Sequence, residues 1–292
     1  MALTSSRLRE LFGEYMIPGE VHLLPDDMKT IILEEMGGSV IWDGVEEVSE
    51  TTSIFGVCKG DDETFEVGHL WFDELIKKAI EKYGEVFLRL NKVALLDSEW
   101  MNGSLSIHNS RDALTLLQAS ERANISLDSH SPNELEIVQY VSINPNQEFR
   151  CFVIQNTLCA IIQRYTDIFT SSIEKQKTQI VTAICSLYDN MHQTNLNIEN
   201  YTFDVMVKGD KATLIDADEL DEYHTKNTLE GFSTLDEIKE AKVKPVFLYV
   251  KEQNQVQPSV KLFQGIPQEF FNDKVIETFN KDPKKLDNMN ID

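Results

Sequence analysis

Residues 201–219 read YTFDVMVKGDKATLIDADE, two β-rich runs separated by a short turn. The runs are Tyr201–Val207 and Lys211–Ile215, and the turn between them is Lys208-Gly209-Asp210. Two such runs joined by a short turn that contains glycine predict an antiparallel hairpin. Because the chain also contains helical stretches, this hairpin indicates the α+β class.

Three aspartates belong to this hairpin. Strand side chains alternate between two faces, so Asp216 and Asp218 project from the same face. If the strand register places Asp204 beside Asp216, three carboxylates converge on one spot. Mg²⁺ suits such a site, because it binds one or two carboxylates and completes its shell with phosphate oxygens and water. An Asp-x-Asp sequence in so acidic a chain is equally compatible with a solvated strand end, and the residues alone leave both interpretations open.

The residues before this hairpin predict further strands and one long helix. A second hairpin is expected to turn about Gln155-Asn156. The helix opens at Ser171, where Glu174 three residues on suggests a capping box. The expected strands are Glu85–Leu90, Leu135–Val141, Glu148–Ile154 and Leu158–Arg164.

The outer parts of the chain add helices, short strands and a loop at Gly44–Phe65. We expect residues 1–130 to form an N-terminal lobe, residues 131–280 a C-terminal lobe with the metal site, and residues 281–292 a disordered tail. The remaining expected elements are helices at Pro25–Met36, Phe72–Tyr83, Asn109–Ala119, beyond Lys226 and at Lys274–Phe279, and strands at Pro245–Val250 and Val260–Phe263.

The composition is that of an acidic globular protein. The chain has 27 basic and 49 acidic residues, for a formal net charge of −22. Such a chain repels the phosphate backbone, so nucleic acid is an unlikely partner except as the substrate of an enzyme. No apolar run approaches the roughly 20 residues that cross a bilayer, so we expect no membrane contact. Met1–Glu10 has no apolar signal region, which predicts a cytoplasmic location.

Three arginines stand in apolar strand-like runs: Arg89, Arg150 and Arg164. A buried arginine must find an anion, because burying an unpaired charge is costly. The anion could be a neighbouring acid such as Glu148, or it could be the phosphates of a nucleotide. Taken singly, each arginine is better explained as a structural ion pair.

Several short motifs, in this order along the chain, resemble the cell-division-cycle protein 123 family, which is similar in fold to ATP-grasp enzymes. The resemblance implies an ATP-grasp-like fold with two lobes, antiparallel sheets and a nucleotide cleft between the lobes. It covers most of the chain, and the order of the motifs makes it specific. The motifs are Glu148-Phe149-Arg150-Cys151-Phe152-Val153, Gln163-Arg164, Phe203-Asp204-Val205 and Leu214-Ile215-Asp216.

The resemblance also implies a role for individual residues, with ATP and Mg²⁺ as the bound groups. Arg89 stands where the family has a lysine that reaches the nucleotide phosphates. The other implied contacts are the backbone of Val138, Gln139 and Tyr140 for adenine, Arg150 and Arg164 for the phosphates, and Asp204, Asp216 and Asp218 for magnesium.

The chain departs from the family in two places. Where the family has Ser-Ala-Pro-Arg-Asp-Ala, this chain has Val93–Ser98, and Leu96 replaces the arginine, so a phosphate contact from that position is lost. Where the family tends to continue Phe-Asn-Pro-Phe after its second metal-site aspartate, this chain has Ala217-Asp218-Glu219-Leu220. An aspartate in place of asparagine keeps an oxygen ligand, so metal binding should survive.

Two functions of different kinds follow from the resemblance. The first is an ATP-loaded chaperone that binds the gamma subunit of eukaryotic translation initiation factor 2 and promotes its assembly. The second is an ATP-dependent ligase or an adenylating enzyme that modifies a protein or an RNA end. No general acid, general base or nucleophile stands out in the sequence. ATP turnover without the protein partner would favour the enzyme.

Overall fold

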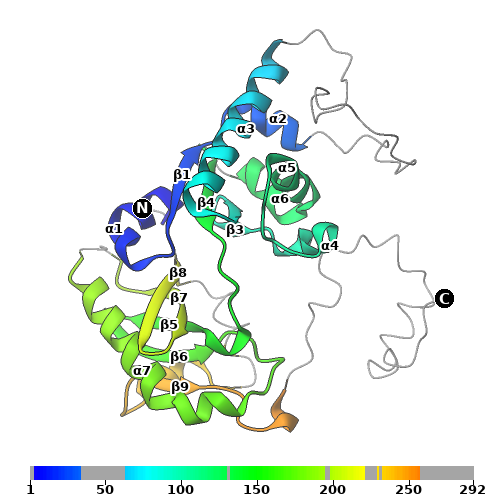
Figure 1. Ribbon diagram of the computed structural model, residues 1–292. Helices are drawn as coiled ribbons and strands as arrows, with labels where there is room; N and C mark the ends of the chain where they lie inside the picture. The colour runs from blue at the N-terminus through cyan, green and yellow to red at the C-terminus, as the bar shows by residue number, and fades with distance from the viewer. Residues whose placement is uncertain are drawn as a thin grey trace, which may run out of the picture.

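The computed structural model describes residues 3–33, 63–129, 132–194, 198–220, 229 and 232–256. Figure 1 shows that the elements gather in two lobes, one drawn above the other, with α1 (Ser5–Phe12) and β8 (Lys211–Glu219) where the lobes meet. Each lobe has a sheet of its own and helices packed on it. Within the described residues, no helix is long and apolar enough to span a bilayer.

The N-terminal lobe is built on a four-stranded antiparallel sheet in the order β1-β4-β2-β3. Its helices and strands share one hydrophobic core, which contains Phe72, Leu88 and Ile137. The strands are β1 Gly19–Leu23, β2 Val86–Leu90, β3 Val93–Ala94 and β4 Glu134–Gln139, and the helices are α2 Asp26–Leu33, α3 Glu63–Tyr83, α4 Glu99–Asn102, α5 Ser110–Ala119 and α6 Glu121–Ser129.

The C-terminal lobe is built on a five-stranded sheet in the order β8-β7-β5-β6-β9. Four strands are antiparallel neighbours, and β9 runs parallel to β6. The remaining strands are β5 Glu148–Ile154, β6 Thr157–Gln163, β7 Tyr201–Lys208 and β9 Val246–Leu248, and the helices are α7 Ser171–His192 and α9 Leu235–Glu240.

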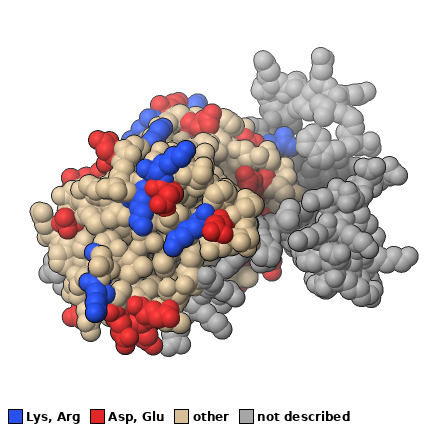
Figure 2. All heavy atoms as spheres, turned by 90° about the horizontal axis from the view of Figure 1, so that it is seen from below, with Lys and Arg blue, Asp and Glu red and all other residues tan. Residues whose placement is uncertain are grey.

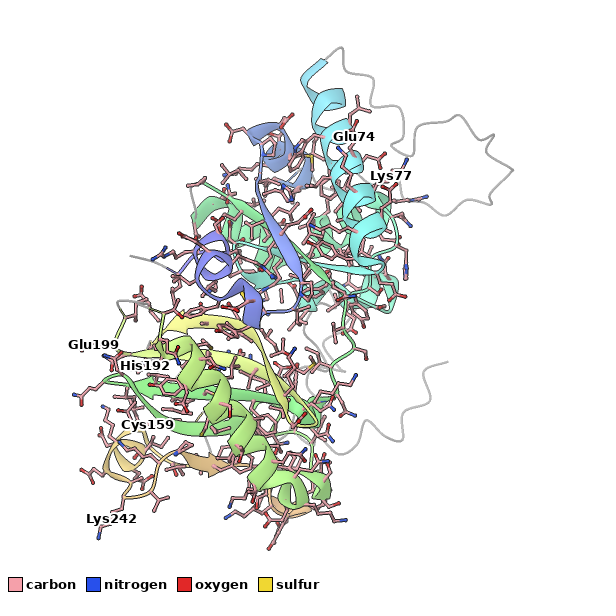
Figure 3. All side chains as sticks on the ribbon, turned by 60° about the vertical axis from the view of Figure 1, so that its left-hand side comes forward. Glu74, Lys77, Cys159, His192, Glu199 and Lys242 are labelled. Atoms are coloured by element: carbon pink, nitrogen blue, oxygen red, sulfur yellow. The ribbon has the colours of Figure 1, made fainter. Side chains whose placement is uncertain are left out.

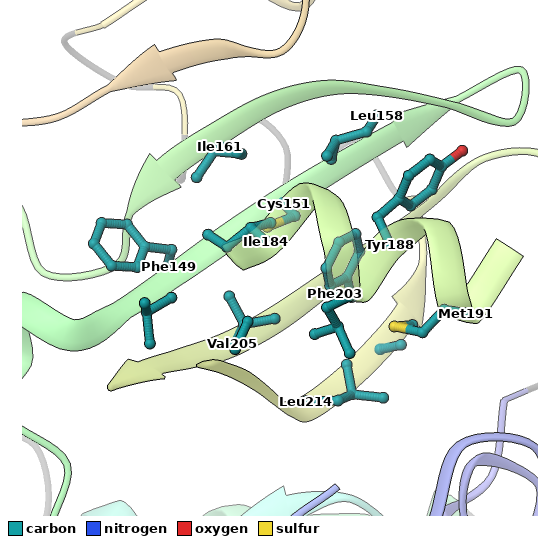
Figure 4. Packing of buried hydrophobic residues seen from close by; sticks show 14 of the residues in the cluster. Phe149, Cys151, Leu158, Ile161, Ile184, Tyr188, Met191, Phe203, Val205 and Leu214 are labelled. Carbon is teal, nitrogen blue, oxygen red and sulfur yellow. The ribbon is translucent and has the colours of Figure 1, made fainter. Parts of the chain in front are cut away.

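Alternation along β5 gives this sheet a core on each face. Cys151 lies in the cluster beneath α7, with Ile184 of that helix (Figure 4). Phe152, the next residue, lies in a second cluster with Ile238 of α9. Successive strand side chains point to opposite faces, so β5 is apolar at nearly every position. Both faces of the sheet are therefore buried, and charged residues such as Arg150 and Asp204 are exceptions within it.

The helix α1 contacts both lobes at once. Leu8 and Phe12 belong to the core of the C-terminal lobe. On the other side of the helix, Arg9 pairs with Glu136 of β4 in the N-terminal sheet at 2.8 Å. Figure 3 shows the N-terminal lobe, with Glu74 and Lys77 labelled, lying directly on the C-terminal lobe, with His192 labelled. This helix holds the two sheets together.

Most expected elements are present, and the α+β class is confirmed. The capping box at Ser171 is wrong: Thr170 is the N-cap of α7, and its side chain makes no capping hydrogen bond. The helix expected from Phe72 begins at Glu63, so the end of the loop predicted at Gly44–Phe65 is helical. The elements α1, β1, β3, α4 and α6 were not predicted from the sequence.

Other expectations lie partly or wholly outside the described residues. These are the loop over residues 44–62, the end of the helix at Pro25–Met36, the strand at Val260–Phe263, the helix at Lys274–Phe279 and the tail at residues 281–292. The lobe boundary between residues 130 and 131 stays a prediction. Strand pairing crosses it, because β4 follows residue 130 and pairs with β1 and β2.

Candidate functional site

The β7–β8 hairpin brings two aspartates side by side. Asp204 of β7 and Asp216 of β8 are register partners, and the register shifts between Asp204 and Val205. Two residues further along, Asp218 pairs with Thr202. The sequence left the strand register open, and the structure places Asp204 beside Asp216. Because β8 is the edge strand next to the N-terminal lobe, these carboxylates lie at the junction of the lobes (Figure 1).

Arg150 holds Asp204 through two hydrogen bonds within one sheet. The β5–β7 register places the two residues opposite each other. The Nε and Nη2 atoms of Arg150 donate to the two carboxylate oxygens of Asp204, at 2.7 and 2.6 Å. Burial alone would raise the pKa of Asp204, but these bonds, with charge from Arg150, Arg164 and Arg89, hold that pKa below its ordinary value. Asp204 is therefore a stable anion.

Arg164 stands at the open end of the same group. Its Nε lies 3.7 Å from Asp204 and 3.8 Å from Glu148, the acid that sequence reasoning offered as a structural partner. The Arg164 side chain is 38% exposed, compared with 10% for Arg150. Of these two arginines, Arg164 is the one that an incoming anion can reach more easily.

Arg89 crosses from the N-terminal lobe to the hairpin. Its register partner in β4 is Glu136, and its Nη1 lies 3.4 Å from that carboxylate. From this position Arg89 donates to the Asp216 carboxylate and to the carbonyl of Ile215, the latter at 3.2 Å. Arg89 thus pairs with two acids, Glu136 of its own sheet and Asp216 of the other lobe, and Asp216 is one of the expected metal ligands.

Asp216 is held differently from its neighbour Asp204. Burial raises its pKa, Arg89 and Lys92 oppose this rise, and the negative charges of Asp218 and Asp204 add to it. The net result is that the pKa of Asp216 lies above its ordinary value. The ionised Asp216 carboxylate is therefore maintained at a cost, which an added cation would relieve.

Lys92 is a residue that sequence reasoning missed. Its Nζ donates to the Asp218 carboxylate and, at 2.6 Å, to the carbonyl of Ala217, and lies 3.5 Å from Asp216. Glu136, buried between Arg9 and Arg89, was also missed. For Glu136 the available signal was an acid between the apolar residues Leu135 and Ile137, and for Lys92 it was an Asn-Lys pair between two strands.

The residues expected to contact adenine lie at the end of β4. Val138 pairs with Gly19 of β1 and with Phe87 of β2. The N–H of Gln139 donates to Pro18, and the N–H of Tyr140 to Glu85, both at 2.8 Å. Two of the backbone donors are therefore already paired in this arrangement. The adenine contact stays a prediction, and the candidate site is defined by the carboxylates and the cations.

The donor set suits Mg²⁺ with a polyphosphate better than a metal alone. Among the described residues, no three His, Cys, Asp or Glu side chains are grouped so that they could hold a metal ion. Asp204 and Asp216, with phosphate oxygens and water, would give the shell that Mg²⁺ favours. The phosphates would meet the cations that now pair with these acids, which are Arg89, Lys92, Arg150 and Arg164.

Charged side chains on the outer surface are more scattered than those of the group between the lobes. On the face in Figure 2, Lys and Arg side chains lie among Asp and Glu side chains on a mostly uncharged background. A nucleic-acid surface would need a continuous band of positive charge. On that face, the described residues form no such band. The candidate site is thus the inter-lobe group of charges rather than a surface patch.

A family model described as D123 matches residues 42–275, about four-fifths of the chain. The chain belongs to the D123 family. A relative from Xenopus tropicalis, described as "Translation initiation factor eIF2 assembly protein", is 27% identical over 292 residues, or 89% of this chain and 87% of the relative. A Dictyostelium discoideum relative with the same description is 33% identical over 156 residues, 48% of this chain and 41% of the relative.

A solved structure shows the same fold. C-terminally truncated Cdc123 from Schizosaccharomyces pombe matches with a TM-score of 0.64 at 20% identity, covering 85% of this chain and 95% of that chain. The resemblance to the cell-division-cycle protein 123 family is therefore confirmed, and so is the α+β class, with one sheet in each lobe. The ATP-grasp-like character of the fold stays a prediction, and the expectation of purely antiparallel sheets is wrong for β9, which runs parallel to β6. At 20% identity this structural similarity shows the fold alone, and it does not show which groups this protein binds.

Proposed function

We propose that this D123-family protein binds ATP together with Mg²⁺ where its two lobes meet. The observation that supports the proposal best is the paired position of Asp204 and Asp216, with cations reaching them from both sheets. The proposed magnesium ligands are Asp204, Asp216 and Asp218. The proposed phosphate contacts are Arg89, Arg150 and Arg164.

Charge balance supports this assignment. Each aspartate in the group now pairs with a cation, so a divalent cation that binds the aspartates takes a negative charge away from each of those cations. Unpaired buried cations are costly, and phosphates that arrive with the metal supply the missing anions. Binding either component alone leaves charges unbalanced. We therefore expect ATP and Mg²⁺ to bind together far better than either binds by itself.

We further infer that the bound nucleotide serves an assembly function in the cytoplasm. Family membership and the descriptions of the Xenopus and Dictyostelium relatives as eIF2 assembly proteins support a function in the assembly of eukaryotic translation initiation factor 2. The proposed partner surface is on the gamma subunit of that factor. In this function ATP organises the two lobes, and the protein acts as a binding module rather than as a catalyst.

Calorimetric titration with ATP tests the nucleotide site. We expect affinity to be at least about tenfold higher with Mg²⁺ than without it, because the aspartates repel unneutralised phosphates. Asp216→Asn should abolish this dependence on metal. Asp210→Asn, at the exposed hairpin turn, is the matched control and should bind as the wild type does. Equal ATP affinity with and without Mg²⁺ would refute the metal site.

Two further measurements decide how the nucleotide is used. We expect the protein to retain ATP without turnover and to bind purified gamma subunit more tightly when loaded with ATP and Mg²⁺. Steady ATP turnover with no protein partner would instead favour the ligase or adenylating enzyme. Loss of gamma-subunit binding in Asp216→Asn, with binding kept in Asp210→Asn, would connect the site to the partner.

A further inference from the structure

Lys92 is the cation whose side chain reaches furthest along β8. It belongs to the N-terminal lobe, in the two-residue turn between β2 and β3, yet its Nζ contacts two carboxylates and a carbonyl of β8. The side chain is 13% exposed, whereas that of Asp218 is 47% exposed. Lys92 is thus directed into the inter-lobe charge group rather than into solvent.

The turn that carries Lys92 is firmly anchored. Asn91 and Lys92 have φ angles of 49° and 68°, the left-handed conformation of a two-residue hairpin turn. This conformation costs a non-glycine residue about 1–2 kcal/mol, so surrounding contacts must hold it. The Asn91 side chain donates to Asn133 at 2.8 Å and accepts from the N–H of Glu134 at 2.8 Å. The position of Lys92 is therefore fixed by its own lobe and does not depend on Asp218.

The partners of Lys92 are two of the proposed magnesium ligands. When a divalent cation binds Asp216 and Asp218, the ammonium group loses both acids and keeps only the Ala217 carbonyl. A largely buried ammonium group needs another anion, and lysine is a common point-charge ligand for phosphate. The anion that accompanies the metal is the polyphosphate.

We propose that Lys92 binds a phosphate of the nucleotide, exchanging Asp218 for that phosphate when Mg²⁺ and ATP enter. Lys92 would thereby supply positive charge near the segment where Leu96 stands in place of the family's arginine. This inference rests on the proposed ATP site and adds to it a ligand on the turn between β2 and β3.

The alternative role for Lys92 makes an opposite prediction. If Lys92 only neutralises Asp218, removing its charge frees that carboxylate for Mg²⁺, and affinity for ATP with Mg²⁺ stays equal or increases. If Lys92 contacts a phosphate, affinity decreases. Adenosine, which has no phosphates, should be insensitive to Lys92 in either case, so it reports on the rest of the site.

The test is calorimetric titration of the full chain with ATP plus Mg²⁺ and, separately, with adenosine. Lys92→Met keeps the aliphatic stem, Lys92→Arg keeps the charge, and Lys82→Met removes a different lysine, one that pairs with Glu20. We expect Lys92→Met to weaken binding of ATP with Mg²⁺ at least about tenfold, adenosine affinity to be unchanged, and Lys92→Arg to recover part of the loss. Lys82→Met should match the wild type.

Each other outcome overturns the assignment. Unchanged or tighter binding of ATP with Mg²⁺ by Lys92→Met would make Lys92 only a structural partner of Asp218. Equal losses for ATP and adenosine would show general damage, and the same loss in Lys92→Arg would show that charge is not what matters. If the wild type itself fails to bind ATP with Mg²⁺, the proposed function fails, and this inference with it.

Discussion

Asp204 and Asp216 are register partners on adjacent strands, yet their surroundings shift their pKa values in opposite directions. Asp204 receives two hydrogen bonds from Arg150, which lies in the same sheet. Asp216 receives its cations, Arg89 and Lys92, from the other lobe. The first carboxylate is stabilised by local strand pairing, and the second depends on how the lobes meet.

This difference separates a structural pair from an exchangeable one. Arg150 and Asp204 meet through strand pairing within one sheet. The bonds to Asp216 and Asp218 join two lobes, and a ligand between those lobes can replace them. Arg89 also retains Glu136 of its own sheet when Asp216 is withdrawn. The cations that serve Asp216 are therefore better suited than Arg150 to change partners when a nucleotide binds.

The largest expected effect is that of Asp204→Asn on stability. This change leaves Arg150 buried without its bidentate partner, and breaking a buried ion pair costs about 3–5 kcal/mol. We expect a loss of that size in the free energy of unfolding, measured by denaturant titration of the nucleotide-free protein. Asp210→Asn should change it by less than about 0.5 kcal/mol. A similarly small change in Asp204→Asn would place both aspartates in the exchangeable class.

An intermediate effect is expected in the pH dependence of stability. The pKa of Asp204 is lowered by folding, so its contribution is present above the unfolded pKa and is lost as pH falls through the folded value. The pKa of Asp216 is raised, so its contribution is present below the unfolded pKa and is lost as pH rises through the folded value. The contributions of the two carboxylates to stability should therefore change with pH in opposite directions.

Unfolding of both asparagine variants between pH 3 and pH 7 measures these signs. Relative to the wild type, Asp204→Asn should lose stability as pH rises. Asp216→Asn should gain stability over the same range and equal or slightly exceed the wild type at neutral pH. Parallel pH profiles for the two variants would show that folding shifts the pKa values of the two carboxylates in the same direction.

The smallest expected effect is that of Asp218→Asn on the nucleotide-free protein. Asp218 is 47% exposed, and Lys92 retains Asp216 and the Ala217 carbonyl without it. The Asp218 carboxylate is half exposed and water solvates it, so its removal should cost no more than about 1 kcal/mol and the thermal midpoint should hardly change. Thermal unfolding with and without ATP and Mg²⁺ gives the comparison, since stabilisation by the ligands should diminish. A large loss in the nucleotide-free protein would make Lys92–Asp218 a structural pair.

Local pattern was enough to predict the hairpins and the long helix. Side-chain alternation and a glycine at the turn are properties of neighbouring residues, so Tyr201–Val207 and the face shared by Asp216 and Asp218 could be inferred directly. The start of α7 at Ser171 was predicted correctly, but its N-cap is Thr170 rather than Ser171, because both residues are suitable caps and the choice depends on the preceding chain. Lys92 was missed because an Asn-Lys turn does not indicate what its lysine reaches.

The sequence by itself determined the α+β class, the family and which charged residues interrupt the apolar strands, because these are properties of residue type and spacing. Only the tertiary structure decided their partners: Arg150 with Asp204, Arg89 with Asp216, and Lys92 with Asp218. The physical reason is the distance along the chain over which each effect acts. Propensity and periodicity act over a few residues, whereas Arg89 and Asp216 are 127 positions apart and meet only because α1 and the two cores bring the sheets together.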